Sequence, residues 1–345
     1  MKELKGYSRG VNLGGWLSQG PKDKAHLNSF ITEKDIKEIA SWGADHIRLP
    51  LDYEIIENED GSERPEGYVY IDSCISWCRK YNLKMVLDLH KTYGYIFDDP
   101  VYSADFFHNA DHQARFLNLW ERLIRRYAKD DDIIMFELLN EVVSGDVIKE
   151  WNELAAKGIA VIRNHTKTAK ILYGGVFNNA ITTVRYLDPP ADENIVYNFH
   201  CYEPLIFTHQ SAYWVVDMPN DFHLNYPGTI EDYREKSESI TGTKNGCLVD
   251  STLHFETLGA EFFEELFKDA LEIAKQRDAA LYCGEYGVID QAPALDTAKW
   301  FRDINSTFNK YGIGRAVWNY KEKDFGLIGP HYDNIRDELN QSIFG

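Results

Sequence analysis

The chain reads Ile133-Ile134-Met135-Phe136-Glu137-Leu138-Leu139 and runs directly into Asn140-Glu141. A short, almost continuously apolar run is typical of a strand that is buried on both faces, as in a parallel sheet. The polar pair follows where the strand leaves the sheet, which is the edge at which parallel α/β barrels place their reactive groups. The stretch therefore predicts a parallel α/β fold with polar side chains at the carboxyl end of this strand.

The same pattern recurs along the chain. Short β-rich runs alternate with longer segments whose apolar residues recur at helical spacing, which favours a parallel sheet with helical crossovers. The expected strands are residues 10–13, 46–49, 85–90, 133–139, 171–174, 195–200, 280–283 and 315–320. The expected helices are residues 32–42, 70–81, 113–128, 147–165, 261–277 and 297–311. Thr32 is expected to cap the first helix, with Asp35 in its first turn.

Eight strands with intervening helices predict an α/β fold of the closed (β/α)8 type, the TIM barrel. An open, doubly wound sheet is the alternative, but no Gly-x-Gly-x-x-Gly motif follows the first strand to bind a dinucleotide. The connection after strand six is long and mixes aromatic with charged residues, and connections of that length are usually functional. We therefore expect one catalytic domain over residues 1–345, with a small subdomain of residues 203–256 inserted at the barrel mouth.

Charge and aromatic content narrow the class of ligand. A formal net charge of -18 at pH 7 repels phosphate backbones and anionic lipid, so we expect no nucleic acid and no membrane as a partner. The 8 Trp and 21 Tyr residues offer flat apolar faces with polar tips, which suit sugar rings. The composition therefore favours a neutral ligand.

Five cysteines are an odd number at irregular spacing, which argues against a disulfide framework. Cys74 and Cys78 are four residues apart, but no second cysteine pair follows to complete a zinc site. The first residues lack an apolar signal sequence, and no run is long enough to span a membrane. We expect reduced thiols, no metal, a monomer, and a cytoplasmic location or secretion with the signal peptide absent from this sequence. The cysteines are Cys74, Cys78, Cys201, Cys247 and Cys283.

Six of the expected strands end in polar or aromatic residues, which packing alone does not explain. Because the carboxyl ends of barrel strands form one shared mouth, we expect these side chains to gather there. Asp88 and His90 would suit a pair of metal ligands, but no His-x-His and no second acidic cluster completes such a site. The strand ends are Arg48-Leu49-Pro50, Asp88-Leu89-His90, Leu139-Asn140-Glu141, Asn198-Phe199-His200-Cys201-Tyr202, Gly284-Glu285-Tyr286-Gly287 and Trp318-Asn319-Tyr320.

Glu141 and Glu285 follow strands four and seven, which face each other across a barrel. Hydrolysis of a glycosidic bond needs one carboxylic acid to protonate the leaving oxygen and one carboxylate to act at the anomeric carbon. A separation of about 5 to 5.5 Å between the two groups gives retention of configuration, and about 6.5 to 9.5 Å gives inversion. Either glutamate alone would be explained as a cap or a salt-bridge partner. The pair together predicts a glycosidase.

Several segments together resemble glycoside hydrolase family 5, the large cellulase family. The resemblance covers nearly the whole chain, and it implies a (β/α)8 barrel and a mainly helical insertion after strand six. The sequence departs from the family pattern in two places, with Asn140-Glu141-Val142 for Asn-Glu-Pro and His90-Lys91 for His-His. The segments are Arg9-Gly10-Val11-Asn12-Leu13-Gly14-Gly15-Trp16, His46-Ile47-Arg48-Leu49-Pro50, Phe136-Glu137-Leu138-Leu139-Asn140-Glu141, His200-Cys201-Tyr202, Tyr282-Cys283-Gly284-Glu285-Tyr286-Gly287 and Trp318-Asn319-Tyr320.

The resemblance implies Glu141 as the acid/base and Glu285 as the nucleophile of a two-step double displacement that uses no cofactor. Arg48 and the Tyr202 hydroxyl would keep Glu285 ionised. Burial and the charge of Glu285 would raise the pKa of Glu141, so that it starts protonated. Once the glycosyl-enzyme forms, that charge disappears and the pKa of Glu141 should fall, so that it can accept a proton from water.

Four further positions complete the site that the resemblance implies. Asn140 would donate to the 2-hydroxyl of the sugar, and Trp318 would stack under the sugar at the cleaved bond. His90 and His200 would orient hydroxyl groups or support the glutamates. Together with Arg48 and Tyr202, these residues are the expected substrate-binding set.

The substrate that the resemblance implies is a β-1,4-linked glucan, cellulose-type or mixed-linkage, as oligosaccharide or polysaccharide. The same glutamate pair also serves enzymes that cut mannan, xylan or β-1,3-glucan, and exo-acting β-glucosidases. A carbohydrate-binding barrel without catalysis is another alternative, for which a substituted glutamate is the signature, and both glutamates are present. A metal-dependent amidohydrolase is the third. The sequence leaves endo and exo action open.

Overall fold

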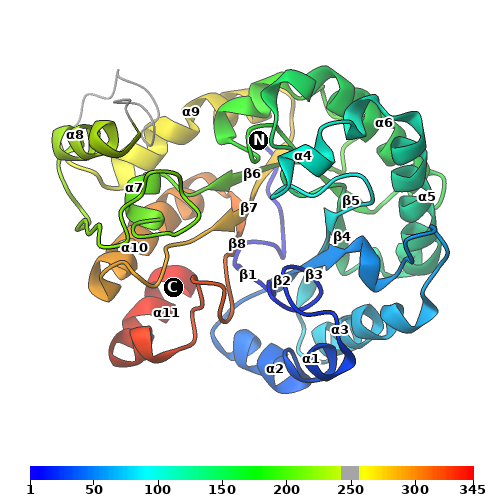
Figure 1. Ribbon diagram of the computed structural model, residues 1–345, viewed down its shortest axis with the longest axis horizontal. Helices are drawn as coiled ribbons and strands as arrows, with labels where there is room; N and C mark the ends of the chain where they lie inside the picture. The colour runs from blue at the N-terminus through cyan, green and yellow to red at the C-terminus, as the bar shows by residue number, and fades with distance from the viewer. Residues whose placement is uncertain (242–255) are drawn as a thin grey trace.

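The computed structural model describes residues 1–241 and 256–345. Eight parallel strands close into a barrel in the order β1-β2-β3-β4-β5-β6-β7-β8, with the helices around it (Figure 1). Each expected run forms a strand, so the predicted (β/α)8 barrel is confirmed. The strands are β1 (Gly10–Asn12), β2 (His46–Asp52), β3 (Lys84–Lys91), β4 (Ile134–Glu137), β5 (Lys170–Gly174), β6 (Ile195–Cys201), β7 (Ala280–Tyr286) and β8 (Gly314–Val317).

The six expected helices are present, with ends that differ by no more than three residues. The predicted cap at Thr32 is confirmed, because Asp35 accepts the Thr32 backbone N–H at 2.7 Å. The connection from β5 to β6 carries a 3-10 helix (Ile181–Tyr186). The α-helices are α1 (Lys24–Ser29), α2 (Glu33–Ser41), α3 (Tyr68–Lys80), α4 (Pro100–Ser103), α5 (Ala110–Tyr127), α6 (Ile148–Arg163), α7 (Leu205–Thr208), α8 (Ile230–Thr241), α9 (Ala260–Gln276), α10 (Ala294–Tyr311) and α11 (Arg336–Phe344).

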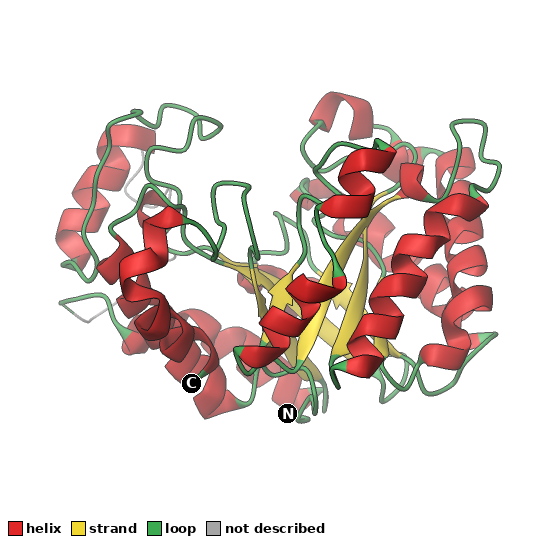
Figure 2. Ribbon diagram, turned by 90° about the horizontal axis from the view of Figure 1, so that it is seen from below, coloured by secondary structure: helices red, strands yellow, loops and turns green. Residues whose placement is uncertain are grey.

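Alternation along the strands divides their side chains between the barrel interior and the layer that faces the helices. Val86 on β3 and Met135 on β4 belong to a small apolar cluster that also includes Leu4 and Tyr7 from the start of the chain. Leu87, the neighbour of Val86, belongs instead to the large core that reaches the helices. Figure 2 shows the strands at the centre, with helices on either side and both chain ends at the lower edge.

Three strands end earlier than predicted, β1 by one residue, β4 at Glu137 and β8 at Val317. The residues that follow lie over the barrel mouth, where the chain turns out of the regular ladder. The peptide bond between Trp318 and Asn319 is cis. The backbone N–H of Trp318 still donates to the carbonyl oxygen of Tyr286 at 2.8 Å, which anchors this segment to β7. The mouth is therefore built from the segments just beyond these strands as well as from the strands themselves.

The connection between β6 and β7 contains α7, α8 and α9. In Figure 1, α8 lies at the outer edge of the molecule beside α9, and α7 lies closer to the strands. The predicted subdomain of residues 203–256 includes α7 and α8, and its last part, residues 242–255, lies outside the described residues. That residues 203–256 form a separate subdomain stays a prediction.

Four cysteines, Cys74, Cys78, Cys201 and Cys283, are buried free thiols. Cys247 lies outside the described residues. Within residues 1–241 and 256–345, no helix combines the length and the apolar character that crossing a membrane requires.

Candidate active site

A cavity of about 700 Å³ opens at the carboxyl ends of the strands. Six of the eight predicted site residues line it, and the other two, Arg48 and His200, are buried and hydrogen-bonded to its two glutamates. The lining residues are Gln19, His90, Phe97, Asp98, Asn140, Glu141, Asn178, Tyr202, Leu205, His209, Tyr213, Trp214, Glu285, Trp318, Lys323, Asp324 and Phe325.

A local irregularity of β7 turns Glu285 towards this cavity. Cys283 and Tyr286 both pack in the core that faces the helices, although strict alternation would place residues three apart on opposite faces. The register shifts between these two residues, and His200 on β6 pairs with Glu285. Two residues, Gly284 and Glu285, therefore lie between two outward positions, which is how a β-bulge redirects a side chain beside a functional site.

Glu141 and Glu285 meet across the barrel. One carboxylate oxygen of each glutamate and one ring nitrogen of His200 all lie within 4.8 Å of one another. The Nδ1 atom of His200 lies 2.7 Å from Glu141 Oε1 and 3.8 Å from Glu285 Oε2. Both carboxyl groups are largely buried, at 9% and 6% exposure of their residues. Two acidic groups, one after β4 and one on β7, thus share one cavity.

Arg48 is a fully buried cation that faces three carboxylates. Its guanidinium donates to both oxygens of Glu137, at 2.7 and 2.8 Å, and to Glu285 Oε1 at 2.7 Å. It also forms an ion pair with Asp88 at 3.0 Å. Burial raises the pKa of Asp88 to about 7, and burial likewise raises the pKa of Glu137. Arg48 is therefore the cation that three acidic side chains share, and one of its bonds fixes Glu285 Oε1.

Glu285 has a second hydrogen-bond donor. The Tyr202 hydroxyl, which follows β6 directly, donates to Glu285 Oε2 at 3.0 Å. Each oxygen of this carboxylate therefore has one donor, Arg48 on one and Tyr202 on the other. Hydrogen bonds to both oxygens fix the orientation of the group.

Glu141 lies in different surroundings. Burial raises its pKa, and the strongest opposing effect is a hydrogen bond from the Asn178 amide to Glu141 Oε2 at 2.8 Å. His200, on the other oxygen, adds no positive charge at neutral pH because burial lowers its pKa to about 4. The pKa of Glu141 is thus raised above the usual glutamate value, while Glu285 is directly paired with a cation. The two glutamates therefore lie in clearly different surroundings.

Trp318 and His90 form one wall of the cavity. Their rings are nearly parallel, with 6.0 Å between centroids and 8° between planes. Gly14 makes room for the indole, because a Cβ atom at this position would lie 2.5 Å from the Trp318 ring. His90 is held by Asp88, whose Oδ2 lies 2.6 Å from its Nδ1, and by Gln19, whose Nε2 lies 3.1 Å from its Nε2. The glycine-rich segment near the start of the chain therefore positions the aromatic wall.

Asn140 completes the predicted set. It follows β4 by three residues, and its side-chain oxygen accepts from Arg48 Nη2 at 2.8 Å. This bond fixes the amide so that its NH2 group is left to donate, and Asn140 lines the cavity beside Glu141. All eight side chains that the sequence singled out are therefore brought together at one mouth.

Sequence reasoning missed several residues of this site. Asn178 follows β5, and its side chain contacts Glu141 directly. Gln19 follows β1 and contacts His90. The insertion contributes His209, Tyr213 and Trp214 to the lining. The sequence did contain a signal for Asn178, because an Asn-Asn pair begins four residues beyond the predicted fifth strand. Polar residues near the ends of the other strands had identified the rest of the site.

The two glutamates and His200 are spaced closely enough to bind a metal ion. The donor set does not favour this use, because the Arg48 guanidinium already bonds to Glu285 at 2.7 Å and would repel a second cation there. The same geometry fits acid and nucleophile chemistry on a sugar without further groups.

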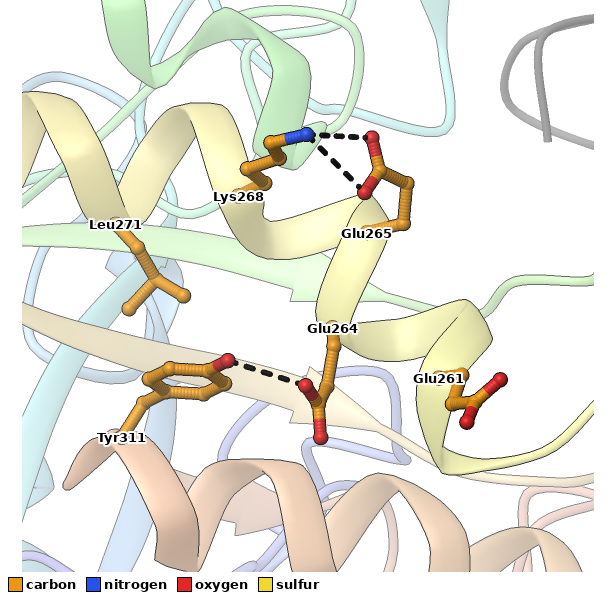
Figure 3. Close-up of a pocket in the computed structure, with 6 residues that line it drawn as sticks. All are labelled: Glu261, Glu264, Glu265, Lys268, Leu271 and Tyr311. Carbon is orange, nitrogen blue, oxygen red and sulfur yellow. Dashed lines mark hydrogen bonds and ion pairs between the residues drawn. The ribbon is translucent and has the colours of Figure 1, made fainter. Parts of the chain in front are cut away.

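A second cavity, of about 520 Å³, lies on the outside of the barrel between α9 and α10 (Figure 3). Its charged groups pair with their own neighbours, Lys268 with Glu265 at 3.1 Å and the Tyr311 hydroxyl with Glu264 at 3.2 Å. It lies away from the carboxyl ends of the strands, where barrel enzymes place their chemistry. The cavity at the mouth is therefore the candidate active site.

The closed barrel and the facing glutamates place the chain among the glycoside hydrolases. The chain belongs to one of their families, because the family described as "Cellulase (glycosyl hydrolase family 5)" matches residues 7–324. It is thus an enzyme of this family, as the sequence motifs predicted.

Relatives of known name share most of the chain. Cellodextrinase A of Ruminococcus flavefaciens is 44% identical over 315 residues, which cover 91% of this chain and 86% of the relative. Endoglucanase C of Acetivibrio thermocellus is 40% identical over 337 residues, which cover 96% of each chain. Among solved structures, a hyperthermophilic endo-beta-1,4-glucanase in complex with substrate matches with a TM-score of 0.78 at 20% identity, covering 99% of this chain and 97% of the other. That likeness supports the barrel fold.

Proposed function

We propose that the protein hydrolyses β-1,4-glucosidic bonds of cellulose-type or mixed-linkage β-glucans with retention of configuration. Glu141 is the acid/base and Glu285 is the nucleophile. The observation that carries the proposal is the spacing of their carboxylate oxygens, the nearest of which lie within 4.8 Å. This spacing suits direct attack on the sugar, because inverting enzymes leave about 6.5 to 9.5 Å between the groups for a water molecule.

In the first step, Glu285 attacks the anomeric carbon while Glu141 gives its proton to the glycosidic oxygen. The bond between the anomeric carbon and the leaving oxygen breaks, and a covalent glycosyl-enzyme forms on Glu285. The bonds from Arg48 and Tyr202 hold the attacking carboxylate in place. Asn140 and Trp318 bind the sugar whose anomeric carbon reacts, the first by its free amide NH2 and the second by its indole face.

In the second step, Glu141 takes a proton from water, and the water oxygen displaces Glu285 from the sugar. The pKa of Glu141 falls after the first step because the nearby carboxylate has become a neutral ester. The Asn178 amide supports this change, since it donates to the ionised form of Glu141. His200, neutral at neutral pH, keeps contact with Glu141 in both steps.

The names of the relatives support glucan as the substrate. Cellodextrinase A and endoglucanase C are 44% and 40% identical over almost the whole chain. A relative described as a probable glucan 1,3-beta-glucosidase A, from Emericella nidulans, is 28% identical over 292 residues. The higher identity and coverage of the first two favour β-1,4 linkages over β-1,3 linkages. A panel of carboxymethylcellulose, lichenan, laminarin, mannan and xylan, with reducing-sugar release as the readout, separates the alternatives.

The catalytic assignment is tested by Glu285→Ala and Glu141→Ala, with Glu261→Ala as the matched control. Glu261 is a glutamate of the outer cavity (Figure 3), so its replacement should leave the activity unchanged. Each catalytic substitution should lower kcat/KM on cello-oligosaccharides by several orders of magnitude while the circular dichroism spectrum stays native. Near-normal activity in Glu285→Ala would contradict the nucleophile assignment, and an α-anomer as first product would contradict retention.

We further propose that the insertion of residues 203–256 forms one side of the cleft and sets the product pattern. Tyr213 and Trp214 line the cavity although 80% and 42% of their surfaces are exposed. Exposed aromatic rings beside paired glutamates suit contacts with further sugar units. Trp214→Ala should shift the products released from a ladder of cello-oligosaccharides. Tyr186→Ala, at an aromatic residue that is 59% exposed and does not line the cavity, is the control, and equal product patterns would refute the proposal.

A further inference from the structure

We infer that Asn178, on the loop after β5, is a positioning residue that holds the carboxyl group of Glu141 in its working orientation. The inference rests on the proposed acid/base role of Glu141. Asn178 Nδ2 donates to Glu141 Oε2 at 2.8 Å, and His200 Nδ1 lies 2.7 Å from Glu141 Oε1. Each oxygen of the acid/base thus has its own partner. Two partners on opposite sides restrict the rotation of the carboxyl group, as transfer of a proton to a fixed oxygen requires.

The backbone ties the loop of Asn178 to the segment that carries Glu141. The Asn178 N–H donates at 3.1 Å to the carbonyl oxygen of Val142, the residue after Glu141. The next residue, Asn179, donates from its side chain to the Asn140 carbonyl oxygen at 3.2 Å. The loop therefore contacts both neighbours of Glu141 through hydrogen bonds, and it places the Asn178 amide where it can reach only one oxygen of the carboxyl group.

The residue type at this position follows from the backbone conformation. Phe177, Asn178 and Asn179 have φ angles of 52, 57 and 55°, in the left-handed region that most side chains avoid. Asparagine adopts this region more readily than other residues with a Cβ atom. A position that needs both a left-handed backbone and a side-chain N–H donor is best filled by asparagine, since glycine supplies only the first and glutamine only the second.

The amide also influences the protonation of Glu141. Burial raises the pKa of Glu141, and the Asn178 donor opposes this because it stabilises the ionised carboxylate. Burial lowers the pKa of both nearby histidines to about 4, so they are neutral at neutral pH. Removing the amide should therefore raise the pKa of Glu141. The charged and titratable groups that face Glu141 are Arg48, Asp88, His90, Tyr95, His200, Tyr202 and Glu285.

Two substitutions separate the amide from the backbone. Asn178→Gly removes the donor and keeps the left-handed conformation, and Asn178→Asp keeps the shape but replaces the donor by a negative charge. The pH dependence of kcat/KM on a soluble cello-oligosaccharide is the measurement, because its alkaline limb follows the loss of the proton from Glu141. The limb should move to higher pH by about 0.4 to 1 unit in Asn178→Gly. This shift corresponds to the net free energy of one hydrogen bond to the ionised carboxylate. It should move further in Asn178→Asp.

Phe177→Gly is the control, because it alters the same left-handed stretch without touching an atom that bonds to Glu141. Its alkaline limb should stay at the wild-type pH. A reduced kcat with an unmoved limb in both Asn178 variants would overturn the inference, because the loop would then act only through its shape. Failure of the proposed function gives a different result, since Glu141→Ala would then keep near-normal activity whatever Asn178 does.

Discussion

Replacing Arg48 by lysine tests how strongly this single guanidinium holds the site together. The side chain makes five hydrogen bonds, two to Glu137 and one each to Glu285, Asn140 and Asn12, between 2.7 and 3.0 Å. Lysine keeps the positive charge but has only three N–H donors on one nitrogen, without the planar fork that reaches several partners. At least two of the five hydrogen bonds must therefore be lost in Arg48→Lys.

The expected cost follows from these lost bonds. A hydrogen bond to a charged group contributes about 1.5 to 3 kcal/mol, so two of them correspond to roughly 3 to 6 kcal/mol of unfolding free energy. The total stability of a domain is about 5 to 15 kcal/mol, so the variant should fold but be clearly destabilised. Its kcat should also fall, because Glu285 loses the donor that fixes one of its oxygens.

Urea unfolding, followed by intrinsic fluorescence, measures this cost. Arg315→Lys is the matched control, because Arg315 is also buried on a strand but bonds to the neutral Asn305 at 2.8 Å. Its cost should be about 1.5 kcal/mol or less. If Arg48→Lys is destabilised by less than about 1 kcal/mol, or by no more than Arg315→Lys, the reasoning that the carboxylate network depends on the guanidinium geometry is wrong.

Three further predictions concern the reaction itself. The alkaline limb of the pH–rate profile should lie above the ordinary glutamate pKa of 4.5, because burial raises the pKa of Glu141 and the first step needs its proton. A limb at or below that pH, measured with cello-oligosaccharides, would contradict the role of Glu141 as the acid. Trp318→Ala should lower kcat/KM by about 10- to 100-fold, because the sugar loses its stacking face. Trp300→Phe is the comparison, at a buried tryptophan outside the cavity. Equal losses of kcat/KM in the two variants would contradict the stacking role of Trp318. Dialysis against a chelator should leave the activity unchanged, since Arg48 already pairs with Glu285; loss of activity that added Zn²⁺ or Mg²⁺ restores would favour the metal-dependent alternative.

Much of the architecture was predictable because it depends on local patterns. Apolar runs of strand length, such as the one that ends before Asn140, alternate with helical segments, and this order allows few folds other than a parallel barrel. Polar residues at the strand ends then had to meet at one mouth. The eight residues that the motifs singled out, including Arg48 and Trp318, do lie at this mouth.

Strand ends were predicted less well, because hydrogen-bond ladders depend on neighbours that are distant in sequence. The predicted fourth and eighth strands extended two and three residues beyond Glu137 and Val317, where the observed strands end. Apolar character continues past these points, at Leu138 and Leu139, so the sequence shows no boundary there. Backbone hydrogen bonds to the neighbouring strands also continue, from the Leu138 N–H to Leu172 and from the Asn140 N–H to Leu89, so only the regular pairing pattern ends at Glu137.

The sequence by itself determined the barrel and the identity of two glutamates on facing strands, because periodicity and residue type are local properties. Only the tertiary structure decided how those glutamates work. The bulge that turns Glu285 inward depends on its pairing with His200, 85 positions earlier in the chain, and the Asn178 amide reaches Glu141 from the loop after β5. A distance of a few ångströms between Glu141 after β4, Asn178 after β5 and Glu285 on β7 exists only once the barrel has closed, since closure fixes the register in which these strands meet.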